Sequence, residues 1–591
     1  MPLGRSFRVV LIALLVAGAT AAAPSVASAA CPKGAQCARV TVPLDHTGAT
    51  AGTLSLAYAK VPATGTRTGT LVLLSGGPGQ AAIPLTEPIA DLFQRLRGSY
   101  DIVTVDQRGT GESGAVSCKL TGKDAVAACA AKLGNQRAFL NTPETARDLE
   151  NLRVALGVDT LTLLGVSYGA KVASEYARRY PAQTAALVLD SPAPVDGLDG
   201  YDQLRTLGAP RVLREVCYPG PCHATVTDPD EALAAAASRL QDGAVRGPLV
   251  SSTGRVRTVR VTESDLYAAL TASDLSPVLR QGLPAAIASL AAGDSAPLLH
   301  LSALLGSGDG DSGDINTARL LATSCIEARL PWAPDSAVAS RADALKAFVA
   351  AHSEGFAPFS AKTVLASSVT ALCETWPPTP KPESVSYLGP NVPVLVISGR
   401  ADLRTPLEDA RRTAAQYPNA KVLAVPGVGH SVLTSDVSGC AVKGMVAFLR
   451  GQAVADCSKT SGLAPLQNLS APYTPATIGA LRPQLLSGLP GRTFSAVSVT
   501  LTGIGYDVAA TFGGKSGRLP GLRAGYYRVT RSAIELHGVE WIRGVRISGR
   551  LSSGGPGTLT ISGASAAPGT VTFTQKGLSL SLGGKSFSVS D

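Results

Sequence analysis

The clearest hydrophobic pattern in the chain covers residues 161–180, LTLLGVSYGAKVASEYARRY. An apolar run ends at Gly165, and from Tyr168 onward apolar positions recur with the spacing of one helix face. The stretch therefore predicts a strand, a sharp turn and a helix. Glycines on both sides of Ser167 leave room for a strained turn of the GxSxG type, which exposes a serine hydroxyl at the carboxyl end of a strand.

Short apolar runs recur along the chain, and helical patterns separate many of them. Their order predicts a mostly parallel sheet that is covered by helices on both faces and binds ligands at the carboxyl ends of its strands. A pair of opening strands is expected before the first buried run. The predicted strands are residues 38–43, 53–61, 70–74, 100–105, 185–189, 394–397 and 422–425, in addition to the strand that leads into Ser167.

The strand pattern lapses over residues 191–390, which are rich in alanine and leucine at helical spacing. We expect this segment to be a helical cap inserted into one α/β domain, formed by residues 31–190 and 391–457. A linker rich in Ser, Pro and Gly follows at 458–474. Residues 475–591 then predict a small all-β module.

The C-terminal module is predicted from short alternating segments between glycine turns, such as 496–502 and 570–574. The tetrapeptide GGPG occurs at 554–557, where it predicts a hairpin turn, and also at 76–79, where it follows a buried strand. Neither an aromatic row nor a charged cluster in the module names a partner. We expect it to serve attachment to a cell surface or polymer, or stability.

The first thirty residues have the layout of a secretory signal peptide. Arg5 and Arg8 precede an apolar run at 9–17, and small residues at 27–29 offer a cleavage site. Cleavage there would leave Cys31 near the new terminus, but Ser28 argues against a lipoprotein signal. Because no other segment has about eighteen uninterrupted apolar residues, we expect a secreted, extracellular protein without an integral membrane segment.

The ten cysteines of an exported chain favour disulfides over metal ligands, and no CxxC pair occurs. Spacing suggests local pairs, although sequence alone leaves the connectivity open. An aspartate-rich segment at 306–314 lacks the acidic residue that a calcium loop needs at its twelfth position, where Leu320 stands. No metal is therefore expected. The expected pairs are Cys31–Cys37, Cys118–Cys129, Cys217–Cys222, Cys325–Cys373 and Cys440–Cys457.

The formal charge of +10 is spread along the chain without a basic run, so no nucleic acid partner is expected.

Three residues at predicted strand ends have the chain order of a serine, acid and histidine triad. Ser167 comes first, Asp402 follows the strand at 394–397, and His430 follows the strand at 422–425. His430 would take the proton of the serine, and Asp402 would orient the imidazole. Asp190, also at a strand end, is the alternative acid. The histidines at positions 46, 223, 300, 352 and 537 lack the place in the chain that the base requires.

With these residues in place, the chain resembles the secreted tripeptidyl aminopeptidases and their proline iminopeptidase-like relatives among the α/β-hydrolases. The resemblance covers residues 31–457 and rests on a small set of matching segments. They are residues 76–79, 106–113, 167–169, 399–406 and 429–430, with 37–45, Cys325 and 373–377 on the tripeptidyl branch.

The resemblance implies an oxyanion hole made by the amides of Gly77 and Tyr168. It also suggests that Glu327 binds the free amino group of a peptide, and it implies no cofactor. Ser75 and Gln80 depart from the pattern of the iminopeptidases, which leaves substrate size and proline preference open.

The expected function is therefore an aminopeptidase that cuts short units from the amino ends of peptides through an acyl-enzyme on Ser167. The same triad would also suit a carboxylic ester or an acyl lipid, because fold and triad do not choose between amide and ester. A more remote alternative is an inert hydrolase domain in a binding protein. Because His430 precedes the linker, a chain that ends near Ser458 is expected to fold and keep most turnover, unless the module packs on the cap.

Overall fold

The computed structural model describes residues 31–122, 124–194, 196–218, 221–224, 226–305, 315–383, 388–459, 470–511 and 517–590. The predicted signal peptide and the aspartate-rich segment 306–314 lie outside these residues. The chain divides into two compact units. Unit 1 is Met1–Gly208, Asp311–Ala357 and Ala361–Gln467, and unit 2 is Ala209–Gly310, Pro358–Ser360 and Asn468–Asp591.

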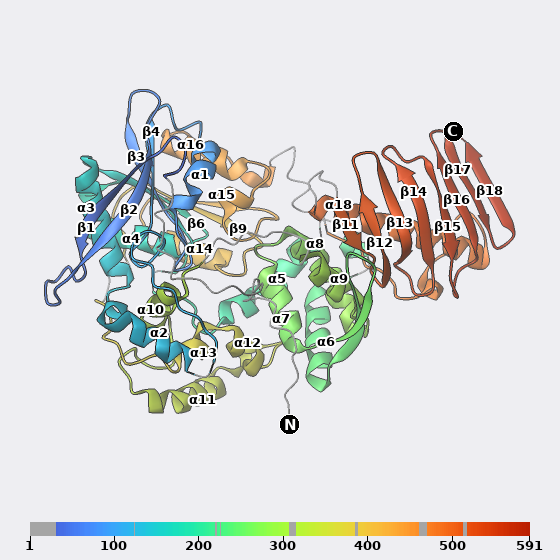
Figure 1. Ribbon diagram of the computed structural model, residues 1–591, viewed down its shortest axis with the longest axis horizontal. Coiled ribbons are helices and arrows are strands. Elements are labelled where there is room, and N and C mark those ends of the chain that lie inside the picture. The colour runs from blue at the N-terminus through green and yellow to red at the C-terminus, as the bar shows by residue number, and fades with distance from the viewer. Residues whose placement is uncertain are drawn as a thin grey trace, which may run out of the picture. The chain divides into compact units, whose positions relative to one another are not determined.

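Unit 1 contains an eight-stranded sheet in the order β1-β2-β4-β3-β5-β6-β9-β10 (Figure 1). The first two strands form an antiparallel pair, and the strands from β4 to β10 are parallel to one another. The predicted, mostly parallel sheet is confirmed. The strands are β1 (Gln36–Pro43), β2 (Thr53–Val61), β3 (Gly69–Leu74), β4 (Tyr100–Val105), β5 (Leu161–Val166), β6 (Thr184–Asp190), β9 (Val394–Gly399) and β10 (Ala420–Val425).

Helices cover both faces of this sheet. Because successive side chains of a strand point to opposite faces, one strand contributes to a core on each face. Val72 and Leu74 pack into a core with residues of three helices, whereas Leu71 and Leu73 pack into a second core with residues of other helices. The first core includes α3 (Thr142–Leu156), α4 (Tyr168–Arg179) and α14 (Leu407–Ala414), and the second includes α1 (Thr86–Leu92) and α16 (Cys440–Leu449).

The inserted segment is mainly helical, as predicted, and also contains the hairpin of β7 (Val245–Val250) and β8 (Val256–Val261). The two compact units divide its helices, so that its earlier part belongs to unit 2 and its later part to unit 1. Its helices are α5 (Gln203–Cys217), α6 (Pro229–Asp242), α7 (Glu263–Ala272), α8 (Pro277–Ala291), α9 (Ala296–Leu305), α10 (Thr317–Glu327), α11 (Arg341–Ala351), α12 (Ala361–Ser367) and α13 (Val369–Cys373).

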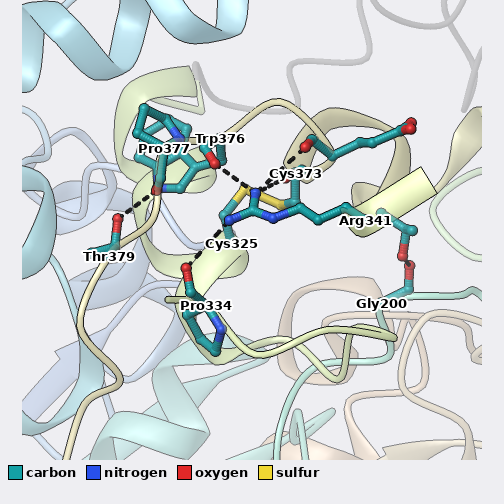
Figure 2. The surroundings of a disulfide bond; sticks show 10 residues. Gly200, Cys325, Pro334, Arg341, Cys373, Trp376, Pro377 and Thr379 are labelled. Atoms are coloured by element: carbon teal, nitrogen blue, oxygen red, sulfur yellow. Dashed lines mark hydrogen bonds between the residues drawn. A yellow bond between two sulfur atoms is a disulfide. The ribbon is translucent and has the colours of Figure 1, made fainter. Parts of the chain in front are cut away.

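All five predicted cysteine pairs are the disulfides of the structure. The bond between Cys325 and Cys373 joins α10 to α13 across 48 residues of chain. Figure 2 shows the guanidinium of Arg341 beside it, where it donates to the carbonyl oxygens of Cys373 and Trp376 at 2.9 and 2.5 Å. The buried arginine and the disulfide therefore stabilise the same turn of the insertion.

The C-terminal part of unit 2 is an antiparallel meander of eight strands, which confirms a β-rich module. Residues 570–574 lie in a strand as predicted, and the second GGPG segment connects β14 to β15. The strands are β11 (Gly517–Pro520), β12 (Ala524–Val529), β13 (Ala533–Glu540), β14 (Arg546–Ser552), β15 (Gly557–Ser562), β16 (Gly569–Thr574), β17 (Gly577–Leu582) and β18 (Lys585–Ser590).

One predicted strand of the module is wrong, because residues 496–502 belong to helix α18 (Gly488–Thr511). The alternation of Ser and Thr with apolar residues in this segment is typical of a strand. Its buried positions, however, are Ala496, Val497, Thr500 and Ile504, which share one face of a helix. The helical period over the longer segment therefore prevails over the short alternation.

The module packs against helices of the insertion inside unit 2. Arg523, which precedes β12, makes a two-pronged ion pair with Asp294 between α8 and α9, at 2.9 and 2.6 Å. His300 of α9 contacts Asp507 of α18 at 2.8 Å. In unit 2 the module thus packs on helices of the insertion, which is the alternative to an independent module.

Candidate active site

Ser167 lies at the sharp turn between β5 and α4, with φ 55° and ψ −118°. A positive φ is strained for a residue with a side chain, and strain of this kind gathers at functional sites. A Cβ at Gly165 would lie 2.4 Å from the carbonyl oxygen of Gly169, and a Cβ at Gly169 would lie 2.1 Å from that of Leu74. Both glycines are therefore required by close packing of the turn.

Asp402 and His430 form a buried pair in the loops that follow β9 and β10. Nδ1 of His430 is 2.8 Å from Oδ2 of Asp402, and Thr405 donates its amide and its hydroxyl to the same carboxylate. Burial raises the pKa of Asp402, but the imidazole and the hydrogen bonds from Thr405 outweigh burial and keep it below 3.8. The carboxylate is thus ionised and orients the ring, so that its other nitrogen, Nε2, remains to accept a proton.

The sheet brings these residues to one edge, because β5, β6, β9 and β10 are neighbouring parallel strands. A Cβ at Gly399 would lie within 2.3 Å of the carbonyl oxygens of Val428 and Gly429, so the two loops pack closely. In the part of the chain that the structure describes, no hydrogen bond joins the Ser167 hydroxyl to His430. Such contacts commonly tighten only when substrate is bound.

Asp190, the alternative acid, has a different place. Its buried carboxylate accepts the amides of Val432 and Leu433, each at 3.0 Å, and the hydroxyl of Ser191. Burial raises the pKa of Asp190 to about 6. The side chain therefore anchors the segment that follows His430, at the start of α15 (Val432–Ser435).

The loop after β3 lies directly against the predicted nucleophile. A Cβ at Gly76 would lie 2.9 Å from the Cβ of Ser167, and Gly77 has φ 108°, which favours glycine. Gln107 of the loop after β4 donates to the carbonyl oxygen of Ser75 at 2.8 Å. Gly77 and Tyr168, the predicted oxyanion donors, thus belong to two backbone segments that meet beside Ser167.

The side chain of Tyr168 is fully buried and makes polar contacts there. Its hydroxyl is 2.9 Å from Oγ1 of Thr142 and accepts from Arg319 of α10 at 3.1 Å. Sequence reasoning did not identify Arg319, because a buried arginine in an insertion has no motif of its own. A helix of the insertion is thereby linked to the residue that follows Ser167.

Glu327, the predicted amine-binding residue, lies in an internal ion pair. Its carboxylate accepts from Nζ of Lys171 at 2.7 Å and from the hydroxyl of Thr142 at 2.6 Å. Burial raises the pKa of Glu327, and Lys171 and Thr142 lower it by more, so the pKa lies below 4.5. The group is therefore an ionised link between α10, α4 and α3, and its oxygens are already occupied.

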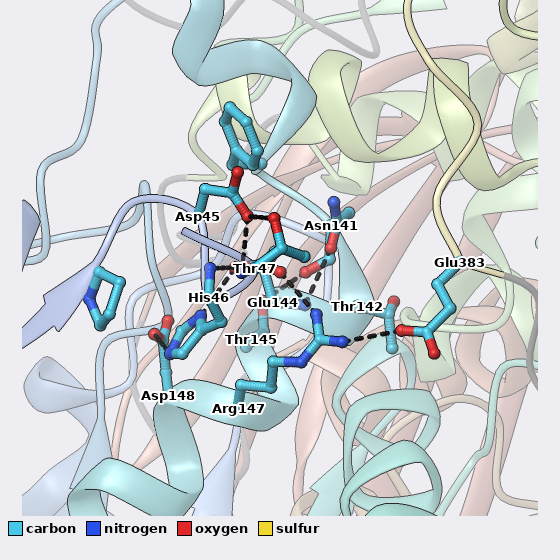
Figure 3. Close-up of polar contacts among 12 residues, drawn as sticks. Asp45, His46, Thr47, Asn141, Thr142, Glu144, Thr145, Arg147, Asp148 and Glu383 are labelled. Carbon is cyan, nitrogen blue, oxygen red and sulfur yellow. Dashed lines mark hydrogen bonds and ion pairs between the residues drawn. The ribbon is translucent and has the colours of Figure 1, made fainter. Parts of the chain in front are cut away.

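The loop after β4 is fixed to α3 by a second buried cluster, part of which Figure 3 shows. Arg108 donates to both oxygens of Asp148, at 2.7 and 2.6 Å. In Figure 3 His46 lies beside Glu144, 2.7 Å from its carboxylate, and Asp148 lies on the other side of the ring. His46 is therefore committed to a structural ion-pair cluster.

The described residues lack two features, a metal-binding cluster and a membrane-spanning helix. They contain no group of three or more His, Cys, Asp or Glu side chains that could hold a metal ion. None of their helices is long and apolar enough to cross a membrane.

Three known proteins have sequences similar to part of this chain. The chain is 33% identical over 190 residues to serine protease Hip1 of Mycobacterium tuberculosis, and the aligned part covers 27% of this chain and 36% of Hip1. It is 29% identical over 191 residues to tripeptidyl aminopeptidase of Streptomyces lividans, covering 27% and 36%. It is 34% identical over 121 residues to proline iminopeptidase of Xylella fastidiosa, covering 20% and 31%.

The alignments thus span only about a third of the length of these curated relatives. The family model described as alpha/beta hydrolase fold matches residues 69–436, which is more than half of the chain. That match contains Ser167, Asp402 and His430 and agrees with the parallel sheet and its strand order. The chain therefore belongs to the α/β-hydrolase fold family.

Proposed function

We propose that the protein is a secreted serine peptidase that releases short units from the free amino ends of peptides. The observation that carries the proposal is the buried His430–Asp402 pair, at 2.8 Å, on the same sheet edge as the strained Ser167 turn. Similarity to proteins named serine protease and tripeptidyl aminopeptidase favours a peptide substrate over other acyl compounds.

In the proposed reaction Oγ of Ser167 attacks the scissile carbonyl carbon while Nε2 of His430 takes the hydroxyl proton. The amides of Gly77 and Tyr168 would donate to the oxyanion. Tyr168 follows Ser167 directly, and Gly77 follows Gly76, which packs against Ser167. His430 then gives the proton to the leaving amine as the C–N bond breaks. Water hydrolyses the acyl-enzyme by the same steps in reverse roles, which returns the proton to Ser167.

Asp402 has a defined part in this sequence. Because it is ionised and fully buried, it stabilises the imidazolium that forms when His430 is protonated. Thr405 donates to the carboxylate and to the carbonyl oxygen of Ser191, so it holds the acid relative to β6.

An ester substrate remains the second candidate, because the same triad cleaves esters. The choice is tested with chromogenic substrates of three kinds: tripeptidyl amides with a free amino end, the same amides with a blocked amino end, and short acyl esters. We expect turnover of the free tripeptidyl amide to exceed that of the blocked form. Hydrolysis of the esters alone, with every peptide inert, would replace the peptidase by an esterase.

Export is part of the proposal and has a separate test. The five disulfides suit an oxidising compartment. The amino-terminal sequence of protein recovered from a culture medium should begin near Cys31. Protein that retains Met1 and stays inside the cells would contradict export.

A further inference from the structure

Unit 2 contains a pocket that has no part in the proposed reaction. Helices α8, α9 and α18 and the segments around Pro472 and Trp541 line it. The volume of this cavity is about 60 Å³. One buried water needs roughly 10–15 Å³ by this measure, so the pocket has room for a molecule larger than water.

A buried histidine and aspartate meet at the wall of this pocket. Nε2 of His300 is 2.8 Å from Oδ2 of Asp507, which also accepts the hydroxyl of Tyr527 at 2.7 Å. His300 is only 6% exposed and its ring lies edge-on to Trp541, with the ring centroids 5.2 Å apart. In the tautomer that carries its hydrogen on Nε2 and donates it to this carboxylate, Nδ1 has a lone pair and can accept a hydrogen bond.

Nδ1 of His300 is buried and has no hydrogen-bond partner among the residues that the structure describes. In that tautomer Nδ1 is a buried acceptor without a partner, which destabilises the fold, so the unpaired group needs an explanation. Since His300 lines the pocket, a bound molecule that donates a hydrogen bond would remove this cost.

The rest of the lining decides the chemical class of that molecule. Ala285, Ala286, Leu301 and Leu522 give apolar walls, and Trp541 adds an aromatic one. No lysine or arginine is among the lining residues in the described part of the chain, so nothing there would neutralise an anion. Polar residues also line the pocket, but the carboxylate of Asp507 already contacts His300 and accepts from Tyr527. A small uncharged body that donates to His300 therefore fits these walls better than an acid. The other polar lining residues are Ser289, Thr474 and Tyr506.

We propose that this pocket is a binding site for a small uncharged molecule with an apolar ring and a hydroxyl, whose hydroxyl donates to Nδ1 of His300. Gly503 of α18 supports the site from behind. A Cβ at Gly503 would lie 2.5 Å from the indole of Trp541, so glycine lets the ring pack on the helix. The site is separate from Ser167 and stands independently of the proposed function.

Benzyl alcohol is the probe for a titration of the full chain, read out by tryptophan fluorescence. The chain has three tryptophans, and only Trp541 lines the pocket. We expect a saturable change that disappears in Trp541→Phe. Toluene, which has the ring without the donor, should bind about tenfold more weakly, as expected for one lost hydrogen bond.

Two variants separate the hydrogen bond from the space. His300→Phe keeps a ring but removes the acceptor, so it should weaken benzyl alcohol about tenfold and leave toluene unchanged or tighter. Ala286→Leu fills the pocket from α8 without touching the His300–Asp507 pair and should abolish both signals. Ala292→Leu, at the exposed end of the same helix, is the matched control and should bind as the parent chain does.

The proposal is overturned by equal binding of benzyl alcohol and toluene to the parent chain, or by binding that survives Ala286→Leu. It is also overturned if glucose saturates the signal and benzyl alcohol does not, or if no probe produces a saturable change. If His300→Phe does not fold, the Ala286→Leu and toluene arms still decide the question.

Discussion

At the scale of single residues, the site depends on carboxylates that burial and hydrogen bonds have given opposite properties. Asp402 has a lowered pKa because His430 and Thr405 outweigh its burial. Asp190 accepts hydrogen bonds from backbone amides, and its pKa is raised because the effect of burial exceeds theirs. One of them is therefore held as an anion beside the imidazole, and the other anchors backbone.

Asp402→Asn tests the role of that anion. The amide has the same shape but would favour the wrong tautomer of His430, so we expect kcat to fall by about 10⁴-fold with little change in KM. Steady-state kinetics on the tripeptidyl amide measure the effect. Asp436→Asn is a control, because Asp436 only caps the turn before α16. A loss below about tenfold in Asp402→Asn would mean that another group orients the base.

Asp190→Asn tests the raised pKa through stability. Between pH 3.8 and about 6 the folded protein holds a proton on Asp190 that the unfolded chain has released. The free energy of unfolding from this group therefore falls as pH rises through that window, by roughly 3 kcal/mol in total. Urea unfolding across the window should show this slope in the parent chain and not in Asp190→Asn. Parallel pH profiles for the two proteins would contradict the assignment.

At the scale of elements, α10 is tied to α3 and α4 by polar contacts that no motif announces. Arg319 donates to the hydroxyl of Tyr168, and Glu327 pairs with Lys171. These contacts link the later part of the insertion to α4, which begins after the Ser167 turn. We expect them to fix the position of that helix end.

Glu327→Gln distinguishes this structural role from binding of a peptide amine. Breaking a buried ion pair on one side costs about 3–5 kcal/mol, so the variant should unfold at lower urea concentration. The double variant Glu327→Gln with Lys171→Met should recover part of that loss, because it leaves no unpaired charge. If KM for free tripeptidyl amides rises while stability is unchanged, Glu327 binds substrate instead.

The elements of the parallel sheet could be predicted because each is an apolar run with a turn signal after it, as at Gly76, Asp106 and Ser167. The candidate triad could be predicted because Ser167, Asp402 and His430 each follow such an apolar run and stand in the order expected of a triad. The helix at 488–511 could not be predicted from 496–502 alone, since a short alternating segment fits both periods. Partners across long separations, such as Arg319 with Tyr168 or His300 with Asp507, arise only from tertiary packing.

At the scale of the whole molecule, the C-terminal module is part of a compact unit that also includes helices of the insertion. Arg523 is buried against Asp294, and α18 contributes Asp507 to the contact with His300. A chain that ends near Ser458 therefore loses the partners of α8 and α9. This packing changes the expectation that such a chain would fold unaided.

Arg523→Ala tests this packing without a truncation. Removing the guanidinium leaves the buried carboxylate of Asp294 with the amide of Ala296 at 3.3 Å and Arg543 at 3.5 Å, so we expect unit 2 to lose about 3 kcal/mol of stability. Proteolysis followed by mass spectrometry should show faster cleavage within residues 229–305. Arg550→Ala, which removes an exposed pair with Glu535, is the matched control and should change little. Equal cleavage rates in the two variants would restore an independent module.

The central claim is that Ser167 is the nucleophile of a peptidase, and covalent labelling tests it most directly. A tripeptidyl phosphonate with a free amino end is mixed with the full chain, and the modified peptide is identified by mass spectrometry. We predict one adduct per chain, on Ser167, that a tripeptidyl amide substrate slows and that Ser167→Ala abolishes, whereas the exposed-site control Ser458→Ala still labels. An adduct on another residue, or undiminished peptide turnover in Ser167→Ala, would contradict the claim.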